Sequence, residues 1–224
     1  MTVLTRRDLM ALLLAAPAAA YAFNDDSAEW ISLFDGKSLD GWKANEHADA
    51  FKVVDGQIAA QGGRSHLFYV GSVKNADFKN FELSAEVMTR PNANSGIYFH
   101  TAYQPSGWPA AGFEVQVSNT DERKIGYSER KKTGSLYAVR NVYKQLVNDN
   151  EWFQMNILVR GKQVQIRVNN MLVVDYVERF SDCVGSTWTL RRVPLLSRNA
   201  PMKVTQLLRK HELRAARHLW IRLQ

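Results

Sequence analysis

The chain has 224 residues, a net charge of +7 and a single cysteine, Cys183. One cysteine excludes an internal disulfide, and no neighbouring base or cation marks it as a nucleophile. The excess charge is confined to one end, because residues 1–180 contain 20 Lys+Arg and 20 Asp+Glu whereas residues 181–224 contain 9 and 2. A neutral body argues against a nucleic-acid-binding domain, since such domains carry a basic surface.

The first 22 residues predict an export signal. Arg6 and Arg7 precede the apolar run LMALLLAAPAAA, and Ala20-Tyr21-Ala22 has the small-x-small pattern of a cleavage site. The run is short for a membrane span, so we expect a removed signal, of twin-arginine type or alternatively of Sec type. These features predict a periplasmic or secreted protein with no membrane span once the signal is removed.

The body from Trp30 to Tyr176 predicts an all-β sandwich. Short runs of alternating apolar and polar residues are separated by turn residues, as in residues 81–87, and helical patterns are few. Residues 152–159, 163–168 and 171–176 predict a three-stranded meander joined by two tight turns.

Two adjacent strands, predicted within NSGIYFHT (94–101) and GFEVQVSN (112–119), separate a polar set from an apolar set. If their apolar residues share one core, the polar side chains project from the same side of one sheet. This polar set comprises Tyr98, His100, Glu114 and Gln116. A histidine and a glutamate on one face can perform acid–base chemistry or bind a metal. The alternative is an ordinary solvated face of an antiparallel sheet.

Two long loops follow these strands. Residues 103–112 contain two prolines and present the indole of Trp108, whereas residues 118–135 are highly charged and are expected to be solvated. His47 and His66 have no partner pattern, and we expect both in loops or on the surface.

Seven motifs occur in family order over about 150 residues and together resemble the 3-keto-disaccharide hydrolase domain family. They are LFDGKSLDGWK (33–43), FKVVDGQIAA (51–60), FELSAEVMTR (81–90), NSGIYFHT (94–101), GFEVQVSN (112–119), TGSLY (133–137) and EWFQMNILVRGKQVQIRVNNMLVVDY (151–176). The resemblance implies a concanavalin A-like, laminin G-like jelly roll of two antiparallel sheets over residues 23–180. It also implies cleavage of glycosides already oxidised to a ketone at sugar carbon 3.

The implied reaction removes the acidic C2 proton, expels the C1 oxygen and adds water to the resulting glycal. Glu114 or His100 is the expected base, and Tyr137 in TGSLY is the expected proton donor. Glu114 is the strongest candidate, because a carboxylate is unusual in mid-strand between Phe113 and Val115. A divalent cation held by Glu114 and His100 is the candidate cofactor. The expected substrate-binding residues are Asn94, Ser95, Tyr98, Gln116 and Trp108.

Three functions remain open on the sequence: a keto-glycoside-cleaving enzyme, a non-catalytic carbohydrate-binding module, and an inactive truncated family member. Each of the first two takes a carbohydrate ligand, but an enzyme depends on Glu114 and a binding module depends on exposed aromatic rings. Asn94 and Ser95 have the further interpretation of a turn that enters a strand.

The resemblance ends after about Glu178, because the family's two closing strands, of the forms GxIALQxH and VxFRNIxI, are not recognisable in residues 181–224. One interpretation is a native basic extension with a helical apolar stripe. The other is a reading-frame shift near residue 180. Loss of the two closing strands would expose apolar surface and unpaired edges and remove a site histidine, so we expect impaired activity.

Overall fold

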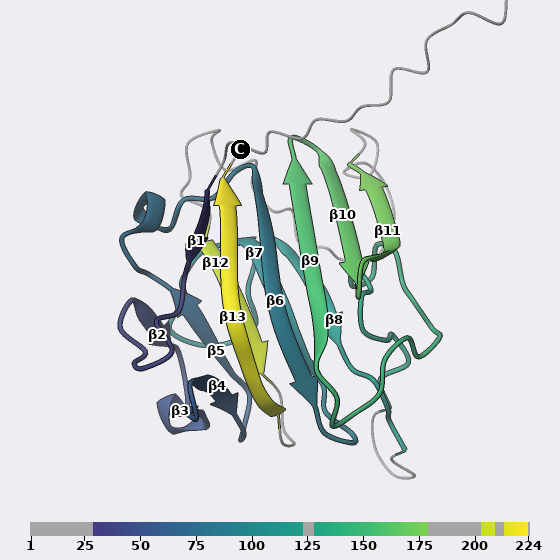
Figure 1. The fold of residues 1–224 in the computed structure, drawn as a ribbon, viewed down its shortest axis with the longest axis horizontal. Coiled ribbons are helices and arrows are strands. Elements are labelled where there is room, and N and C mark those ends of the chain that lie inside the picture. The colour runs from purple at the N-terminus through teal and green to yellow at the C-terminus, as the bar shows by residue number, and fades with distance from the viewer. Residues whose placement is uncertain (1–28, 123–127, 179–202, 209–212, 224) are drawn as a thin grey trace, which may run out of the picture.

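The computed structural model describes residues 29–122, 128–178, 203–208 and 213–223, which form two antiparallel sheets packed face to face (Figure 1). One sheet has eight strands in the order β11-β10-β9-β6-β13-β4-β3, with β1 beside β13; the other has five, in the order β2-β5-β12-β7-β8. This is the predicted all-β jelly-roll sandwich. The strands are β1 (Trp30–Ser32), β2 (Trp42–Ala44), β3 (Phe51–Val54), β4 (Gln57–Ala60), β5 (Ser65–Tyr69), β6 (Phe81–Thr89), β7 (Ser95–Thr101), β8 (Phe113–Val117), β9 (Phe153–Arg160), β10 (Gln163–Val168), β11 (Met171–Val177), β12 (Lys203–Leu208) and β13 (Leu213–Leu223), with short 3-10 helices η1 (Ala48–Ala50) and η2 (Val73–Ala76).

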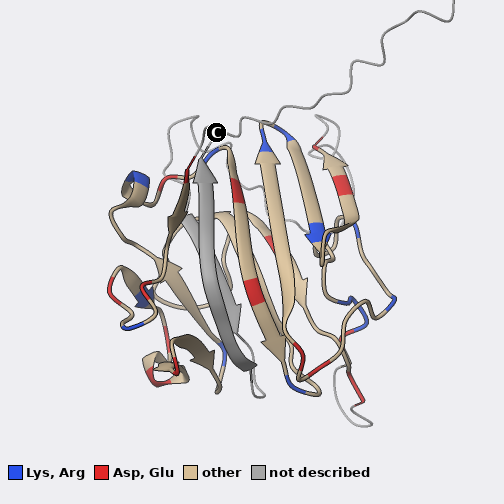
Figure 2. Cartoon of the chain, in the orientation of Figure 1, with Lys and Arg blue, Asp and Glu red and all other residues tan. Residues whose placement is uncertain are grey.

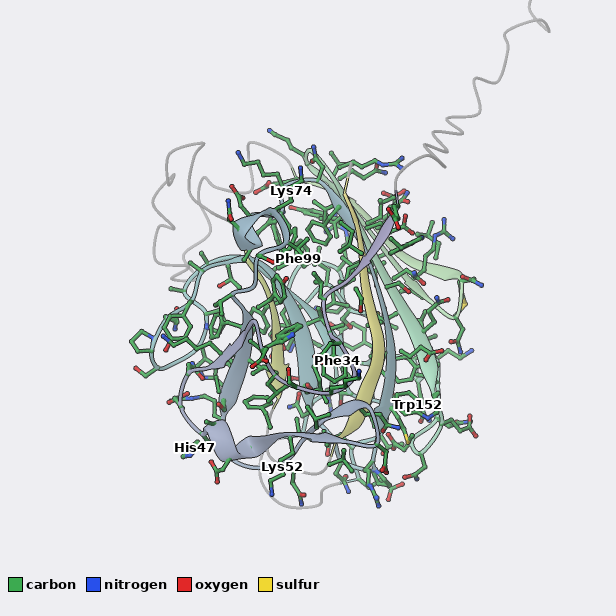
Figure 3. All side chains as sticks on the ribbon, turned by 60° about the vertical axis from the view of Figure 1, so that its left-hand side comes forward. Phe34, His47, Lys52, Lys74, Phe99 and Trp152 are labelled. Atoms are coloured by element: carbon green, nitrogen blue, oxygen red, sulfur yellow. The ribbon has the colours of Figure 1, made fainter. Side chains whose placement is uncertain are left out.

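The core lies between the two sheets and is built from alternate residues of each strand. Phe81 of β6 and Phe99 of β7 are completely buried, and their rings meet across the sandwich at 5.9 Å between centroids. Phe99 is labelled in Figure 3, among the side chains that fill the interior. The alternation predicted for residues 81–87 is confirmed, because Phe81, Leu83, Ala85 and Val87 are all buried in the core.

The predicted meander is present as β9, β10 and β11. The second turn is made by Asn169 and Asn170, whose φ angles of +47° and +65° suit the primed turns that join twisted antiparallel strands. On the outer face, the side-chain amides of Gln163 and Gln165 both donate to the carboxylate of Asp175. Figure 2 shows acidic positions on β6 and β11 and basic positions near the ends of β9 and β10, so residues of both charges occur along the eight-stranded sheet.

The two described segments of the tail are strands inside the sheets. β12 pairs with β5 on one side and β7 on the other, and β13 pairs with both β4 and β6. The prediction of a helix in this tail is wrong for residues 203–208 and 213–223. Both segments lie between two neighbouring strands, whose backbone groups provide their hydrogen-bond partners. The two closing positions of the sandwich are therefore occupied rather than missing.

The predicted export signal (residues 1–22) and Cys183 lie outside the described residues. Within the described residues, no helix has the length and apolarity that a membrane crossing requires.

His100 ends the regular part of β7 and does not follow its alternation. Its φ angle is +56°, a left-handed conformation that interrupts the pleat. The imidazole packs against the rings of Phe81, Phe99 and Phe113, and its Nε2 lies 3.2 Å from the carbonyl oxygen of Lys79. Burial lowers the pKa of His100, and the hydrogen bond with Lys79 opposes this shift only in part.

Truncation after Glu178 should abolish cooperative folding. The change removes an interior strand from each sheet and leaves β5, β7, β4 and β6 with unpaired edges. Urea unfolding followed by tryptophan fluorescence should show no cooperative transition for the truncated chain. The matched control lacks residues 1–22 only and should unfold like the full chain; a single sharp transition in both truncations would contradict the described placement of β12 and β13.

The half-buried His100 should make the protein less stable as the pH falls. An unfolded chain protonates this histidine near pH 6.5, whereas the folded protein does so only at lower pH. Between these two values the unfolded state binds the extra proton, so the free energy of unfolding decreases with decreasing pH. His100→Asn tolerates the left-handed conformation and does not titrate. Thermal denaturation should show that the melting temperature falls less for this variant than for the wild type between pH 7 and pH 5. Equal decreases in both proteins would refute a role of His100 in the pH dependence.

Candidate functional site

Glu114 and its two cross-strand neighbours form a row on the outer face of the five-stranded sheet. Tyr98 of β7 lies directly opposite Glu114 of β8, and its hydroxyl donates to Glu114 Oε2 at 2.8 Å. On the other side of β8, the Tyr137 amide donates to the Glu114 carbonyl at 2.8 Å, so residues 134–137 extend the sheet. Tyr98 is buried, whereas Glu114 and Tyr137 are half-buried and can be approached from solvent.

The carboxylate of Glu114 lies over Gly96, because that residue has no side chain. A Cβ at Gly96 would lie 2.4 Å from Glu114 Oε1 and 2.7 Å from its Cγ. Both distances are shorter than non-bonded atoms tolerate, so a side chain at position 96 would displace the carboxylate. The position of the Glu114 carboxylate is therefore set by the missing side chain of Gly96 and by the hydroxyl of Tyr98.

Gln116 follows Glu114 on the same face and is almost completely buried. Its Nε2 donates to Asn94 Oδ1 at 2.8 Å, and its Oε1 has no hydrogen-bond partner within the described part of the chain. The structure thus brings Asn94 and Gln116 together beside the Glu114 row. An amide oxygen in this state is an acceptor suited to a hydroxyl or a water.

Two predicted site residues are not brought to Glu114. His100 was expected on the Tyr98 face, but its positive φ and its aromatic packing separate it from the carboxylate. Ser95 pairs with Val117, so alternation places it with Ile97 and Phe99 on the core side of β7. The prediction that His100 shares a face with Glu114 is therefore wrong, and Ser95, predicted as a substrate-binding residue, lies on the opposite face of β7 from Tyr98.

His66, which was expected to be a loop or surface residue, lies on this face of the sheet and is completely buried. Its ring meets the Tyr98 ring edge-on, with centroids 6.1 Å apart. Asn45 fixes it, because Asn45 Oδ1 accepts from the His66 amide at 2.8 Å and Asn45 Nδ2 lies 3.2 Å from His66 Nδ1. Strand alternation within residues 65–69 could have predicted this placement. It puts His66 and Phe68 on one face of the strand and Leu67 and Tyr69 on the other.

Tyr137 is bonded to a second carboxylate. Its hydroxyl donates to Glu129 Oε2 at 3.2 Å, and Lys131 Nζ lies 3.4 Å from Glu129 Oε1 and 4.2 Å from the centre of the Tyr137 ring. Only 1% of Glu129 is exposed, so the expectation that this charged loop is solvated is wrong at Glu129. Burial lowers the pKa of Lys131, but hydrogen bonding to Tyr137 and the charge of Glu129 outweigh it and leave the pKa raised.

A metal bound jointly by Glu114 and His100 does not fit this geometry, because the two side chains lie in different surroundings. Within the described residues, no three His, Cys, Asp or Glu side chains are grouped so that they could hold an ion.

Trp108 lies in the loop between β7 and β8, with 37% of its surface exposed. Its ring contacts the His66 ring at 5.4 Å and a right angle. Trp108, His66, Tyr98 and Glu114 thus form a continuous series of contacts along the outer face of the five-stranded sheet.

Comparison with known proteins agrees with this architecture. A curated relative from Bacteroides thetaiotaomicron, named 3-keto-disaccharide hydrolase, is 24% identical over 177 residues, which cover 67% of this chain. The chain spans only 59% of the length of that relative.

Two solved structures share the fold. A crystal structure from Parabacteroides distasonis, described as a candidate glycosyl hydrolase, has a TM-score of 0.68 and 21% identity and covers 89% of this chain and 95% of its own. A carbohydrate-binding module from Bacillus subtilis has a TM-score of 0.53 and 9% identity and covers 81% and 95%.

The family model described as "3-keto-alpha-glucoside-1,2-lyase-like domain" matches residues 29–184. This match includes every strand from β1 to β11 and all the residues of the Glu114 row, and it covers well over half of the chain. The protein therefore belongs to the family of 3-keto-α-glucoside-1,2-lyase-like domains.

Proposed function

We propose that this protein cleaves 3-keto-glycosides by removing the C2 proton of the keto-sugar, with Glu114 as the base. The observation that carries the proposal is the carboxylate of Glu114, which is fixed by the Tyr98 hydroxyl and lies over Gly96 on an accessible sheet face. Family membership supports the substrate class.

The reaction is an elimination followed by hydration. The C3 ketone acidifies the C2 proton; Glu114 takes this proton, and the electrons of the C–H bond delocalise onto the C3 oxygen as an enolate. Collapse of the enolate breaks the bond between C1 and the glycosidic oxygen, which leaves with a proton from an acid. Water then adds across the C1–C2 double bond of the glycal. The route needs one base and one acid rather than the paired carboxylates of ordinary glycosidases.

Tyr137 is the proposed acid. It lies opposite Glu114 on the neighbouring segment, on the far side from Tyr98. Glu129 orients its hydroxyl, and the ammonium of Lys131 stands over the ring, where positive charge stabilises the phenolate that remains after proton donation.

The remaining polar side chains position the base. His66 supports the ring of Tyr98 and is itself held by Asn45, so this pair fixes the donor to Glu114. Gln116 and Asn94 are buried beside the base and hold each other by an amide hydrogen bond. The export signal predicted in residues 1–22 supports a periplasmic or secreted site of action.

A non-catalytic carbohydrate-binding module is the second candidate. The exposed indole of Trp108 favours it, since binding modules use such rings to stack against sugars. The two candidates differ in their dependence on Glu114.

Glu114→Gln should abolish turnover of a phenyl 3-keto-glucoside. The amide keeps the shape of the side chain but cannot take a proton, so we expect a loss of about 10²- to 10⁴-fold in kcat, measured by phenol release. Glu82→Gln, on the opposite sheet, is the matched control and should retain activity. Full turnover by Glu114→Gln would refute the assigned base, and a wild-type protein that binds the substrate without cleaving it would favour the binding module.

Tyr137→Phe should slow the reaction according to the leaving group. A methoxide leaving group needs protonation, whereas nitrophenolate leaves without it, so the loss in kcat should be about 10²-fold for methyl and small for nitrophenyl 3-keto-glucoside. Steady-state rates with both substrates provide the comparison. Equal losses with both leaving groups would remove Tyr137 from the role of acid.

A further inference from the structure

We propose that residues 103–112 form a preformed subsite for the leaving-group half of the substrate, with the indole of Trp108 as its platform. This inference rests on the proposed function and specifies which part of the substrate Trp108 recognises. It gives the protein a preference for leaving groups that contain a ring.

The loop leaves β7 and enters β8, the two strands that carry Tyr98 and Glu114, but it packs against β5. The Tyr103 ring meets Phe68 at 5.1 Å, and the Trp108 ring meets His66 at 5.4 Å, both nearly at right angles. Because Phe68 and His66 lie on the same face of β5, the loop covers the outer face of this strand, which β12 separates from β7.

Hydrogen bonds fix the shape of the loop. The side chain of Gln104 donates to the carbonyls of Ser106 and Trp108 and accepts from the amide of Ala110 at 3.0 Å. Gly107 has a φ of +79°, which glycine adopts without strain. A platform held in this way loses little conformational entropy when a ligand binds.

Two charged residues lie beside the loop: Glu46, which follows β2, and Arg64, which precedes β5. Glu46 accepts from the Arg64 guanidinium at 2.7 and 3.0 Å, and it also accepts from the Gly107 amide. The Arg64 guanidinium lies over the Trp108 ring, 5.7 Å from its centroid, as in a cation–π contact. Because Glu46 neutralises Arg64, this surface does not select an anion. It suits a neutral group with an apolar face.

The position of Trp108 decides which part of the substrate it contacts. His66 stands between Trp108 and Tyr98, with ring separations of 5.4 and 6.1 Å, so the indole does not adjoin the carboxylate that takes the C2 proton. When the keto-sugar ring lies at Glu114, the leaving group attached through the glycosidic oxygen contacts the indole of Trp108. An aryl ring or a second sugar ring presents the flat apolar surface that stacks on an indole, whereas a methyl group does not reach it.

Binding of phenyl and methyl 3-keto-glucoside tests the subsite. Isothermal titration of Glu114→Gln and of the double variant Glu114→Gln/Trp108→Ala measures affinity without turnover. Loss of the indole should weaken phenyl binding by about 3- to 10-fold and leave methyl binding unchanged. In the active protein, Trp108→Ala should raise KM for the phenyl substrate with kcat unchanged, because a remote contact contributes equally to ground and transition states.

Tyr143→Ala is the matched control, since Tyr143 is an aromatic residue with 66% of its surface exposed and lies outside this loop. It should alter neither affinity. Trp108→Phe keeps a flat ring and should recover part of the affinity for the phenyl ligand. This variant distinguishes loss of stacking from disruption of the loop. An equal effect of Trp108→Ala on both ligands, or no effect on either, would overturn the subsite. Absence of turnover in the wild type with an intact affinity difference would instead overturn the proposed reaction alone.

Discussion

The site depends on one close approach: the side chain of Glu114 lies in the space that a side chain at position 96 would otherwise fill. The register of β7 and β8 sets this contact, because Gly96 is opposite Gln116 and Tyr98 is opposite Glu114. Tyr98 then holds one oxygen of the carboxylate by a hydrogen bond of 2.8 Å. A carboxylate fixed in this manner needs no reorganisation before it takes a proton, which is the general advantage of a preorganised site.

The rest of the five-stranded sheet supports this arrangement. β12 separates β5 from β7, and the backbone of Thr205 pairs with Phe68 on one side and Tyr98 on the other. This placement brings the β5 side chains within reach of the Glu114 row, so Asn45 and His66 can fix the ring of Tyr98. The tail strands thus matter for the site as well as for stability. Without β12, the five-stranded sheet would lose the strand that joins β5 to β7.

Local alternation predicted much of this architecture and failed where the chain is irregular or contacts are non-local. It grouped Tyr98, Glu114 and Gln116 correctly, because residues two apart in a strand share a face. It failed at His100, where a left-handed residue interrupts the pleat, and the helical stripe in the tail gave no indication of strands that pair with distant partners. The burial of Glu129 was likewise unpredictable, since it depends on Tyr137 and Lys131 folding back around a charged loop.

If Glu114 removes the C2 proton of a keto-sugar, hydrogen exchange at C2 depends on this residue. Methyl 3-keto-glucoside would be incubated in D₂O with wild-type protein and with Glu114→Gln, and the C2 proton followed by NMR. We expect the wild type to remove the C2 proton signal. With Glu114→Gln the signal should decay only as fast as it does in buffer without protein. Release of methanol by the wild type with the C2 proton retained would contradict the account.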